Sequence, residues 1–318
     1  MPITITTWNV QNFSKGSKAF EEKLDFLANT LEALGSDVVA LQEILDPEAL
    51  QAIADRLSFH AFAASPDGRG NRVAFLTREP PVEPPQDIIE WQLPPGEVVR
   101  RFSRDGEAAI EPNLPRPAQQ ITVSHGDKKI TLLNVHMKSK LLTFGRSRFS
   151  TSDETLRVQT AYFGLKRRAA ESTTLREIST QLLADKQNII LLGDFNDGPQ
   201  AATTEALYGP PGSQPRGPDD STRAFGAFQR KDKGDTQRLF NITNLVPAEI
   251  RWTREHKGKK EMLDYILVSE GLMPRDRDGL RQVPKMSILN EDVPNLVSSN
   301  PNVGGIVPDH APVTATFV

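Results

Sequence analysis

Eight short segments rich in β-branched and other apolar residues recur along the whole chain, each bounded by turn residues. Most of them are apolar on both faces, whereas a strand with one solvated face alternates apolar and polar residues. We therefore predict strands that are covered on both sides, by helices or by a second sheet. The predicted strands are Ile3–Thr7, Asp37–Leu41, Arg72–Thr77, Gln119–Ser124, Ile130–His136, Asn188–Leu192, Met262–Val268 and Ala311–Phe317.

Helical patterns occupy several of the intervals between these strands. In Ala19–Leu34, apolar residues recur every three or four positions. Pro47–Leu57 begins with a proline at its first position and follows Asp46, a favoured N-cap residue. Asp153–Asp185 is the longest such pattern. Strands and helices that alternate over the whole length predict a single α/β domain spanning residues 1–318.

Three insertions rich in proline, glycine and aspartate interrupt this alternation, near 79–117, 209–234 and 271–307. Loops of this length are uncommon in compact domains and tend to be functional or disordered. The chain has 318 residues, enough to bury a full core without covalent staples. It contains no cysteine, which excludes a disulfide framework, thiolate metal sites and a cysteine nucleophile.

The charge balance and the apolar runs limit the partners of the chain. A formal net charge of −3 argues against coating of nucleic acid by bulk positive charge, although a local basic groove stays open. No run approaches the ~18 apolar residues of a membrane helix. The start, MPITITTWNV, lacks the pattern of a secretory signal. We expect a cytoplasmic monomer without membrane attachment or a stable protein partner, or a secreted protein if a leader has been removed.

Acidic, amide and imidazole side chains recur where the predicted strands end or begin, which is where open α/β sheets place their sites. Taken singly, each has an ordinary explanation, such as a solvated carboxylate, a turn or a hydrogen-bonded histidine. Taken together they indicate a site, because an adjoining apolar segment fixes the position of each. The candidates are Asn9, Glu43, Asn134, His136, Asp194, Asn196, Asp197, Asp264, Asp309 and His310.

The chemistry of this set favours metal-assisted hydrolysis. Carboxylate and amide oxygens suit Mg²⁺ or Mn²⁺, and histidines oriented by carboxylates transfer protons and stabilise charge. The chain contains no GxxxxGK[ST], HExxH or GxSxG motif, so nucleotide-triphosphatase, zincin and serine-hydrolase interpretations lack their signatures. We therefore predict metal-assisted attack of water on a phosphate ester.

Six segments resemble, in order, the motifs of the endonuclease/exonuclease/phosphatase superfamily: TWNVQNF, LQEI, NVHMKS, GDFND, LDYILVS and PDHAPV. This superfamily includes pancreatic deoxyribonuclease, abasic-site endonucleases, neutral sphingomyelinases and inositol polyphosphate 5-phosphatases. The resemblance covers essentially the whole chain. It implies a four-layered α/β sandwich, with two mixed β-sheets packed face to face and helices outside. It also implies an Mg²⁺ or Mn²⁺ cofactor, with Ca²⁺ as an accessory cation in some settings.

The resemblance further implies roles for individual residues. Glu43 would be the principal metal ligand, with Asn9 and Asp309 also on the metal side. Asp194 would orient or deprotonate the attacking water, and Asn196 would hold the phosphate or the nucleophile.

Two histidines complete the implied catalytic set. His310 would contact the scissile phosphate, with Asp264 orienting its ring. His136 stands where deoxyribonuclease-like members place a histidine that helps protonate the leaving oxygen. Abasic-site endonucleases typically have a tyrosine there, and an acidic residue at the position of Gln11. Both departures argue against abasic-site repair.

Substrate contacts are expected from residues that favour the bacterial nuclease-like branch. HMKSK resembles a motif that would direct Lys138 toward phosphate, and Arg157 resembles an arginine of this branch. Trp252 is a candidate for stacking on a base. The alternatives are solvated charge for the two basic residues and packing for the tryptophan. Segments 138–148, with four basic and no acidic residues, and 251–260, with five basic and one acidic residue, could contact a polyanion.

We therefore expect a divalent-metal-dependent phosphodiester hydrolase, a nuclease of low sequence specificity with nucleic acid as substrate. The alternative enzyme is a phosphatase or phosphodiesterase acting on lipid headgroups, inositol phosphates or nucleotides, because one catalytic core serves all these substrates in the superfamily. The absence of a clear amphipathic membrane-binding helix counts mildly against lipids. A catalytically silent binding module is disfavoured by the complete set of site residues.

Overall fold

The computed structural model describes residues 2–102, 108–144, 149–185, 187–209, 237–272, 285–291 and 305–317. Within these residues the chain forms two six-stranded sheets. In spatial order, the first sheet contains β15 (Lys285–Ile288), β16 (Val313–Phe317), β1 (Ile3–Phe13), β2 (Val38–Ile44), β4 (Arg72–Thr77) and β3 (His60–Ala63). The second contains β11 (Leu239–Asn241), β14 (Asp264–Ser269), β10 (Asn188–Asp194), β9 (Lys128–His136), β8 (Asn113–His125) and β5 (Glu83–Glu90).

The remaining elements are helices and two small hairpins. The helices are α1 (Phe20–Ala33), α2 (Pro47–Leu57), α3 (Glu154–Ala184) and α4 (Ala202–Tyr208), with 3-10 turns η4 (Ile242–Leu245), η5 (Ala248–Ile250) and η6 (Glu270–Leu272). One hairpin pairs β6 (Arg100–Phe102) with β7 (Ala108–Ile110), and the other pairs β12 (Arg254–His256) with β13 (Lys259–Glu261). Among the described residues, no helix is both long enough and apolar enough to cross a membrane.

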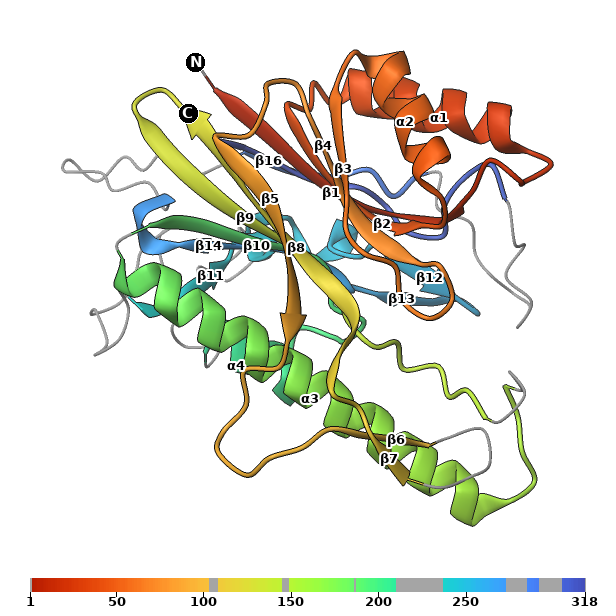
Figure 1. The fold of residues 1–318 in the computed structure, drawn as a ribbon. Helices are drawn as coiled ribbons and strands as arrows, with labels where there is room; N and C mark the ends of the chain where they lie inside the picture. The colour runs from red at the N-terminus through yellow and green to blue at the C-terminus, as the bar shows by residue number, and fades with distance from the viewer. Residues whose placement is uncertain are drawn as a thin grey trace.

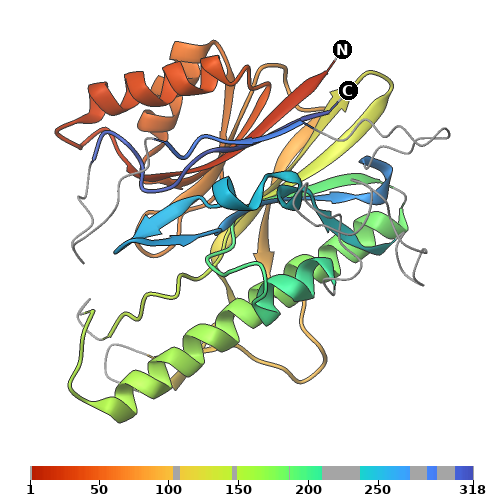
Figure 2. The ribbon, with the colours of Figure 1, turned by 180° about the vertical axis from the view of Figure 1, so that it is seen from behind.

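Four layers are visible in Figure 1: α1 and α2, the first sheet, the second sheet, and α3 with α4. Strand β2 shows why its sequence is apolar on both faces. Val38 and Ala40 pack in the core between the sheets, whereas Val39 and Leu41 pack against α1 and α2. Figure 2 shows α3 crossing the outer face of the second sheet. The predicted four-layered α/β sandwich with two mixed sheets is therefore confirmed.

Each sheet contains a parallel pair of strands joined by a crossover helix. Strands β1 and β2 are parallel and are connected through α1, and β9 and β10 are parallel and are connected through α3. The other pairings within the two sheets are antiparallel. The carboxyl ends of both parallel pairs carry candidate site residues, so the two sheets contribute to one site.

The prediction of a loop for residues 79–117 was wrong in part. This segment contains β5, which pairs with β8 at the edge of the second sheet, the whole β6–β7 hairpin and the first residues of β8. Pro84 and Pro85 in β5 argued against a strand, but proline is tolerated at a sheet edge because no further strand needs its missing N–H. Most of the predicted insertions 209–234 and 271–307 lies outside the described residues.

Candidate active site

Three candidate residues form a row across the second sheet. Asp194 is the register partner of His136 on β9 and of Asp264 on β14. Neighbours in register direct their side chains to the same face of a sheet. Gly193 precedes Asp194 with φ +136°, and a Cβ there would collide with the Val135 carbonyl oxygen. Glycine therefore allows β10 to approach β9 closely at the point where the row begins.

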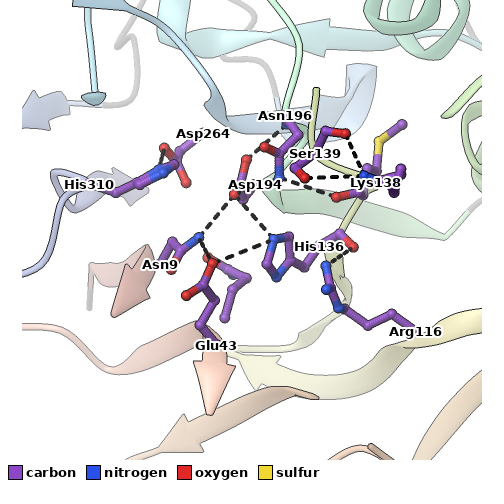
Figure 3. Close-up of polar contacts among 12 residues, drawn as sticks. Asn9, Glu43, Arg116, His136, Lys138, Ser139, Asp194, Asn196, Asp264 and His310 are labelled. Carbon is purple, nitrogen blue, oxygen red and sulfur yellow. Dashed lines mark hydrogen bonds and ion pairs between the residues drawn. The ribbon is translucent and has the colours of Figure 1, made fainter. Parts of the chain in front are cut away.

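Asp194 lies at the centre of the polar contacts in Figure 3. Its Oδ2 accepts hydrogen bonds from Asn9 Nδ2 over 3.0 Å and from Asn196 Nδ2 over 2.9 Å. Its Oδ1 accepts from the Asn196 backbone N–H over 2.8 Å, and His136 Nε2 lies 3.4 Å from Oδ2. Asn196 has φ 55°, a left-handed conformation that asparagine adopts more readily than most residues. The turn after β10 thus folds back onto the carboxylate.

Asn9 and Glu43 reach this centre from the first sheet. Asn9 Nδ2 also donates to Glu43 Oε1 over 3.2 Å, so one amide group joins the Glu43 and Asp194 carboxylates. Beyond Asn9, β1 forms a bulge in which Gln11 N–H donates to Asn9 Oδ1 and Asn12 N–H donates to Glu43 Oε2, each over 3.0 Å. Gln11, Asn12 and Glu43 all have positive φ values, of 51°, 52° and 65°. Such backbone strain concentrates at functional sites.

His310 and Asp264 form a buried pair on the other side of Asp194. His310 Nδ1 and Asp264 Oδ2 are 2.7 Å apart. The His310 carbonyl accepts a hydrogen bond from Trp8 Nε1 over 2.8 Å, which fixes the backbone that carries the ring. The neighbouring Asp309 pairs with Arg254 Nε over 3.3 Å.

The charges in this site are set by burial and by neighbouring groups. Burial, with the Asp264 charge, raises the pKa of Asp194 to about 7. Burial opposes protonation of His310, but the charges of Asp264 and Asp194 outweigh it and raise the pKa of His310 to about 10. Burial and the nearby Arg116 hold the pKa of His136 well below its usual value. Near neutral pH, therefore, His310 is cationic and His136 is neutral.

The site fits a divalent metal ion. Asp194, Asp264 and His310 each offer a ligand atom within 4.8 Å of the other two. Asp264 Oδ1 is buried without a hydrogen-bond partner among the described residues, as expected where a cation completes the site. Carboxylate groups are ordinary ligands of divalent metals, whereas the cationic His310 would have to lose its proton before its ring could bind one. This cluster differs from the predicted metal set of Asn9, Glu43 and Asp309, although the Asn9 amide links the two.

The structure brings most of the predicted site residues into one cluster: Asn9, Glu43, His136, Asp194, Asn196, Asp264 and His310 (Figure 3). Asp309 adjoins this cluster through its neighbour in the sequence, but its carboxylate contacts Arg254.

The three residues predicted to contact substrate, Lys138, Arg157 and Trp252, make their contacts outside this cluster. The Lys138 ammonium donates to Ser139 O and Leu141 O, each over 2.9 Å, so it folds back onto its own loop. Trp252 is buried, and Lys260 Nζ lies 4.4 Å from the centre of its ring. Arg157 is exposed and pairs with Glu154. Arg146 and Arg148, which belong to the first basic segment, lie outside the described residues.

Two supporting groups near the site were not predicted. Arg116 Nη1 donates to the His136 carbonyl over 3.1 Å, and its Nε and Nη2 donate to Asp67 Oδ2. Glu171 is buried on α3, where its carboxylate accepts from the Lys138 backbone N–H over 2.7 Å. Arg116 lies within a predicted insertion. Glu171 could have been found from the sequence, because it lies in the middle of a long predicted helix, where a charged residue on the sheet-facing side is unusual.

Comparison with known proteins identifies the family. The sequence model described as "Endonuclease/Exonuclease/phosphatase family" matches residues 6–287. The chain belongs to this family. The resemblance seen in the six sequence motifs is thereby confirmed, and family membership makes the chain a metal-dependent phosphoesterase. No curated protein sequence matches the chain.

Solved structures share the fold of this family at low sequence identity. A family protein from Leptotrichia buccalis C-1013-b is 16% identical, with 99% of each chain covered and a TM-score of 0.54. D. rerio TDP2 complexed with single strand DNA product is 15% identical over 100% of this chain and 99% of that chain, with a TM-score of 0.52. The human Nocturnin catalytic domain with bound sulfate is 15% identical over 100% and 94%, with a TM-score of 0.51.

Proposed function

We propose that this protein is a divalent-metal-dependent phosphodiester hydrolase, most specifically a nuclease of low sequence specificity. The observation that carries the proposal is the position of Asp194. Its carboxylate contacts Asn9 from the first sheet and lies beside both His136 and the Asp264–His310 pair. In-line attack of water on a phosphate is helped by a base for the water, positive charge for the phosphoryl oxygens and an acid for the leaving oxygen. Asp194, His310 and His136 are placed to supply these three functions.

Glu43 is the proposed principal ligand of an Mg²⁺ or Mn²⁺ ion. Its side chain is 21% exposed, compared with 1% for Asp194 and 0% for Asp264. Mg²⁺ keeps several of its waters, so a partly exposed carboxylate suits it. Asn9 lies beside Glu43 and donates a hydrogen bond to it. Asp309 pairs with Arg254, so its carboxylate would have to leave this arginine to bind the metal. When bound, the metal would polarise a phosphoryl oxygen and neutralise negative charge.

In this proposal Asp194 and His136 transfer protons, and His310 stabilises negative charge. A pKa of about 7 allows Asp194 to accept a proton from water near neutral pH, while Asn196 fixes its orientation. The cationic His310 would stabilise charge on the phosphoryl oxygens, with Asp264 holding its ring. His136 is neutral in the free protein, and an approaching anionic phosphate would raise its pKa so that it can protonate the leaving oxygen.

Basic side chains beside the site support a polyanionic substrate. The β12–β13 hairpin and its turn carry Arg254, Lys257, Lys259 and Lys260. The hairpin lies next to the site, because Arg254 and His310 pair through their backbones in an isolated antiparallel β-bridge. The exposed lysines of this hairpin could contact phosphates away from the bond that breaks. That a structure of D. rerio TDP2 holds a single strand DNA product makes a polynucleotide the first substrate to test.

The proposal is tested with a panel of substrates in Mg²⁺, Mn²⁺ or EDTA. The panel contains plasmid, single-stranded DNA, RNA, bis-nitrophenyl phosphate and nitrophenyl phosphate. We expect metal-dependent cleavage of a polynucleotide, and loss of that cleavage in Asp194→Asn. Asp185→Asn, at an exposed aspartate beyond the end of α3, is the matched control and should keep full activity. Release of phosphate from the monoester without polynucleotide cleavage would replace the nuclease with a phosphatase.

A further inference from the structure

A lysine is buried beside the candidate site without an assigned role. Lys23 lies on the core-facing side of α1, three residues after Phe20 and four before Leu27, and it is 1% exposed. Lysine is almost never fully buried unless its charge is satisfied, because removing an ammonium group from water is costly. A lysine buried at this position therefore needs a specific reason.

The Lys23 ammonium is directed at the bulge of β1. Its Nζ donates a hydrogen bond to the Gln11 carbonyl over 2.8 Å, and within the described part of the chain it forms no ion pair with a carboxylate. Burial lowers the pKa of Lys23 to about 8, and the charges of Glu43 and Asp309 oppose this shift. The ammonium therefore lies within the electrostatic field of both acids while its hydrogen bond goes to the backbone.

One peptide unit connects Lys23 to Glu43. The Gln11 carbonyl accepts from Lys23, and the N–H of the same peptide, on Asn12, donates to Glu43 Oε2 over 3.0 Å. In a trans peptide the carbonyl and the N–H point in opposite directions within one plane. An ammonium on the carbonyl therefore both orients this N–H toward Glu43 and polarises it.

The backbone at this peptide needs such support. Gln11 and Asn12 have φ values of 51° and 52°, and consecutive left-handed residues that are not glycine are unfavourable. The neighbouring Gln11 N–H donates to Asn9 Oδ1, so the same bulge holds the other candidate residue of the first sheet. Movement of the bulge would displace Asn9 and Glu43 together.

We propose that Lys23 is a positioning residue: its ammonium fixes the Gln11–Asn12 peptide and thereby holds the Glu43 carboxylate ready to bind a divalent metal. This inference rests on the proposed function, in which Glu43 is the principal metal ligand. Lys23 itself contacts neither substrate nor metal. Its effect should therefore appear in metal affinity and in the dynamics of the bulge.

The test compares Mn²⁺ binding by calorimetry in the wild-type protein and in Lys23→Met. Methionine replaces the aliphatic stem of the lysine with an unbranched apolar chain of similar length and has no ammonium. We expect Mn²⁺ affinity to fall by about 10- to 100-fold, as is typical when a group supporting a metal ligand is lost. In the metal-free protein, hydrogen exchange of the peptide covering Gln11 and Asn12 should be about tenfold faster than in wild type, because the bulge opens more readily.

A chemical rescue keeps the test valid if Lys23→Met folds poorly. The chain has no cysteine, so Lys23→Cys carries a single thiol. Alkylation with 2-bromoethylamine in denaturant, followed by refolding, restores an ammonium at nearly the original position. Mn²⁺ affinity should then return to within about threefold of wild type, whereas Lys23→Cys without alkylation should stay weak.

Two reference variants separate the possible outcomes. Leu31→Ala removes a buried side chain further along the same helix while leaving the Lys23 hydrogen bond to Gln11 in place, and it should bind Mn²⁺ like wild type. An equal loss in Leu31→Ala would overturn the inference, because general loosening of α1 would explain the effect. Wild-type affinity in Lys23→Met, with weak binding in Glu43→Gln, would overturn the role of Lys23 alone. Equal affinity in wild type and Glu43→Gln would reject the metal assignment and this inference with it.

Discussion

Gln42 Nε2 donates a hydrogen bond to Asn134 Oδ1 over 2.8 Å, and these two buried residues come from different sheets. Asn134 Nδ2 in turn donates to the backbone carbonyls of Leu41 and Ala74 in the first sheet. The candidate site takes Asn9 and Glu43 from strands of the first sheet and His310 from the segment that leads into β16 of the same sheet. Its other residues come from the second sheet and the turn after β10. This amide link next to the site therefore sets the spacing of its two halves.

Replacing Asn134 by leucine, which has a similar shape, should destabilise the protein by at least about 2 kcal/mol, because several buried polar groups lose their partner. Urea unfolding measures this loss. Catalytic turnover should also fall, since the sheets can shift against each other. Thr122→Val is the control: it removes a hydrogen bond to Thr131 within one sheet and should lower stability by about 1 kcal/mol or less without changing turnover. Equal effects of both variants would remove the special role of the link.

Asp194 and His310 should act on the same chemical step. Asp194→Asn and His310→Ala are each expected to lower kcat by about 10²- to 10⁴-fold, because one removes the base and the other removes positive charge near the phosphate. The double variant should lose far less than the product of the two effects, since groups that act as a unit are not additive. Steady-state kinetics on bis-nitrophenyl phosphate measures all three variants. Losses that multiply fully would show that the two residues act independently.

The raised pKa of His310 makes a prediction about stability in EDTA. A group whose pKa rises from 6.5 in the unfolded chain to about 10 in the folded protein holds its proton more tightly when folded. Its contribution is therefore fully present below pH 6.5 and is lost as pH rises through 10. The difference in unfolding free energy between wild type and His310→Gln should shrink over this range. A difference that stays constant from pH 6 to 10.5 would contradict the cationic assignment.

The basic hairpin should matter for polymers and not for small diesters. Lys257→Gln with Lys259→Gln should weaken polynucleotide cleavage and flatten its dependence on salt, because fewer phosphates are contacted. Lys128→Gln with Lys129→Gln is matched in charge but lies at the start of β9, at the opposite end of the strand from His136. This control should leave cleavage unchanged, and neither pair should affect bis-nitrophenyl phosphate. Equal losses with both pairs would indicate a general effect of net charge.

The part of the site carried by buried strands could be predicted from the sequence. His136, Asp194 and Asp264 each adjoin a segment that is apolar on both faces, and such a segment has one stable place inside the sandwich. The position of the apolar residues therefore fixed the position of the polar ones. Helical spacing and capping residues located α1, α2 and α3 to within about one residue.

The supporting contacts could not be predicted in the same way. Lys23 reads as one of several charged residues in α1, and only its spacing from Phe20 and Leu27 hints at the core face. The strained bulge at Gln11 and Asn12 has no glycine to announce it. Contacts such as these depend on two segments meeting in space, and a periodic pattern within one segment carries no information about them.

In the proposed mechanism, Glu43 binds the metal with which this protein hydrolyses phosphodiesters. The most direct measurement is the initial rate of cleavage of a single-stranded oligonucleotide as a function of Mg²⁺ concentration, for wild type, Glu43→Gln and the exposed control Glu48→Gln. We predict saturable Mg²⁺ dependence with no cleavage in EDTA, an unchanged curve for Glu48→Gln, and a rate lowered by orders of magnitude for Glu43→Gln. Cleavage in EDTA at the full rate, or a Glu43→Gln curve that matches wild type, would contradict the claim.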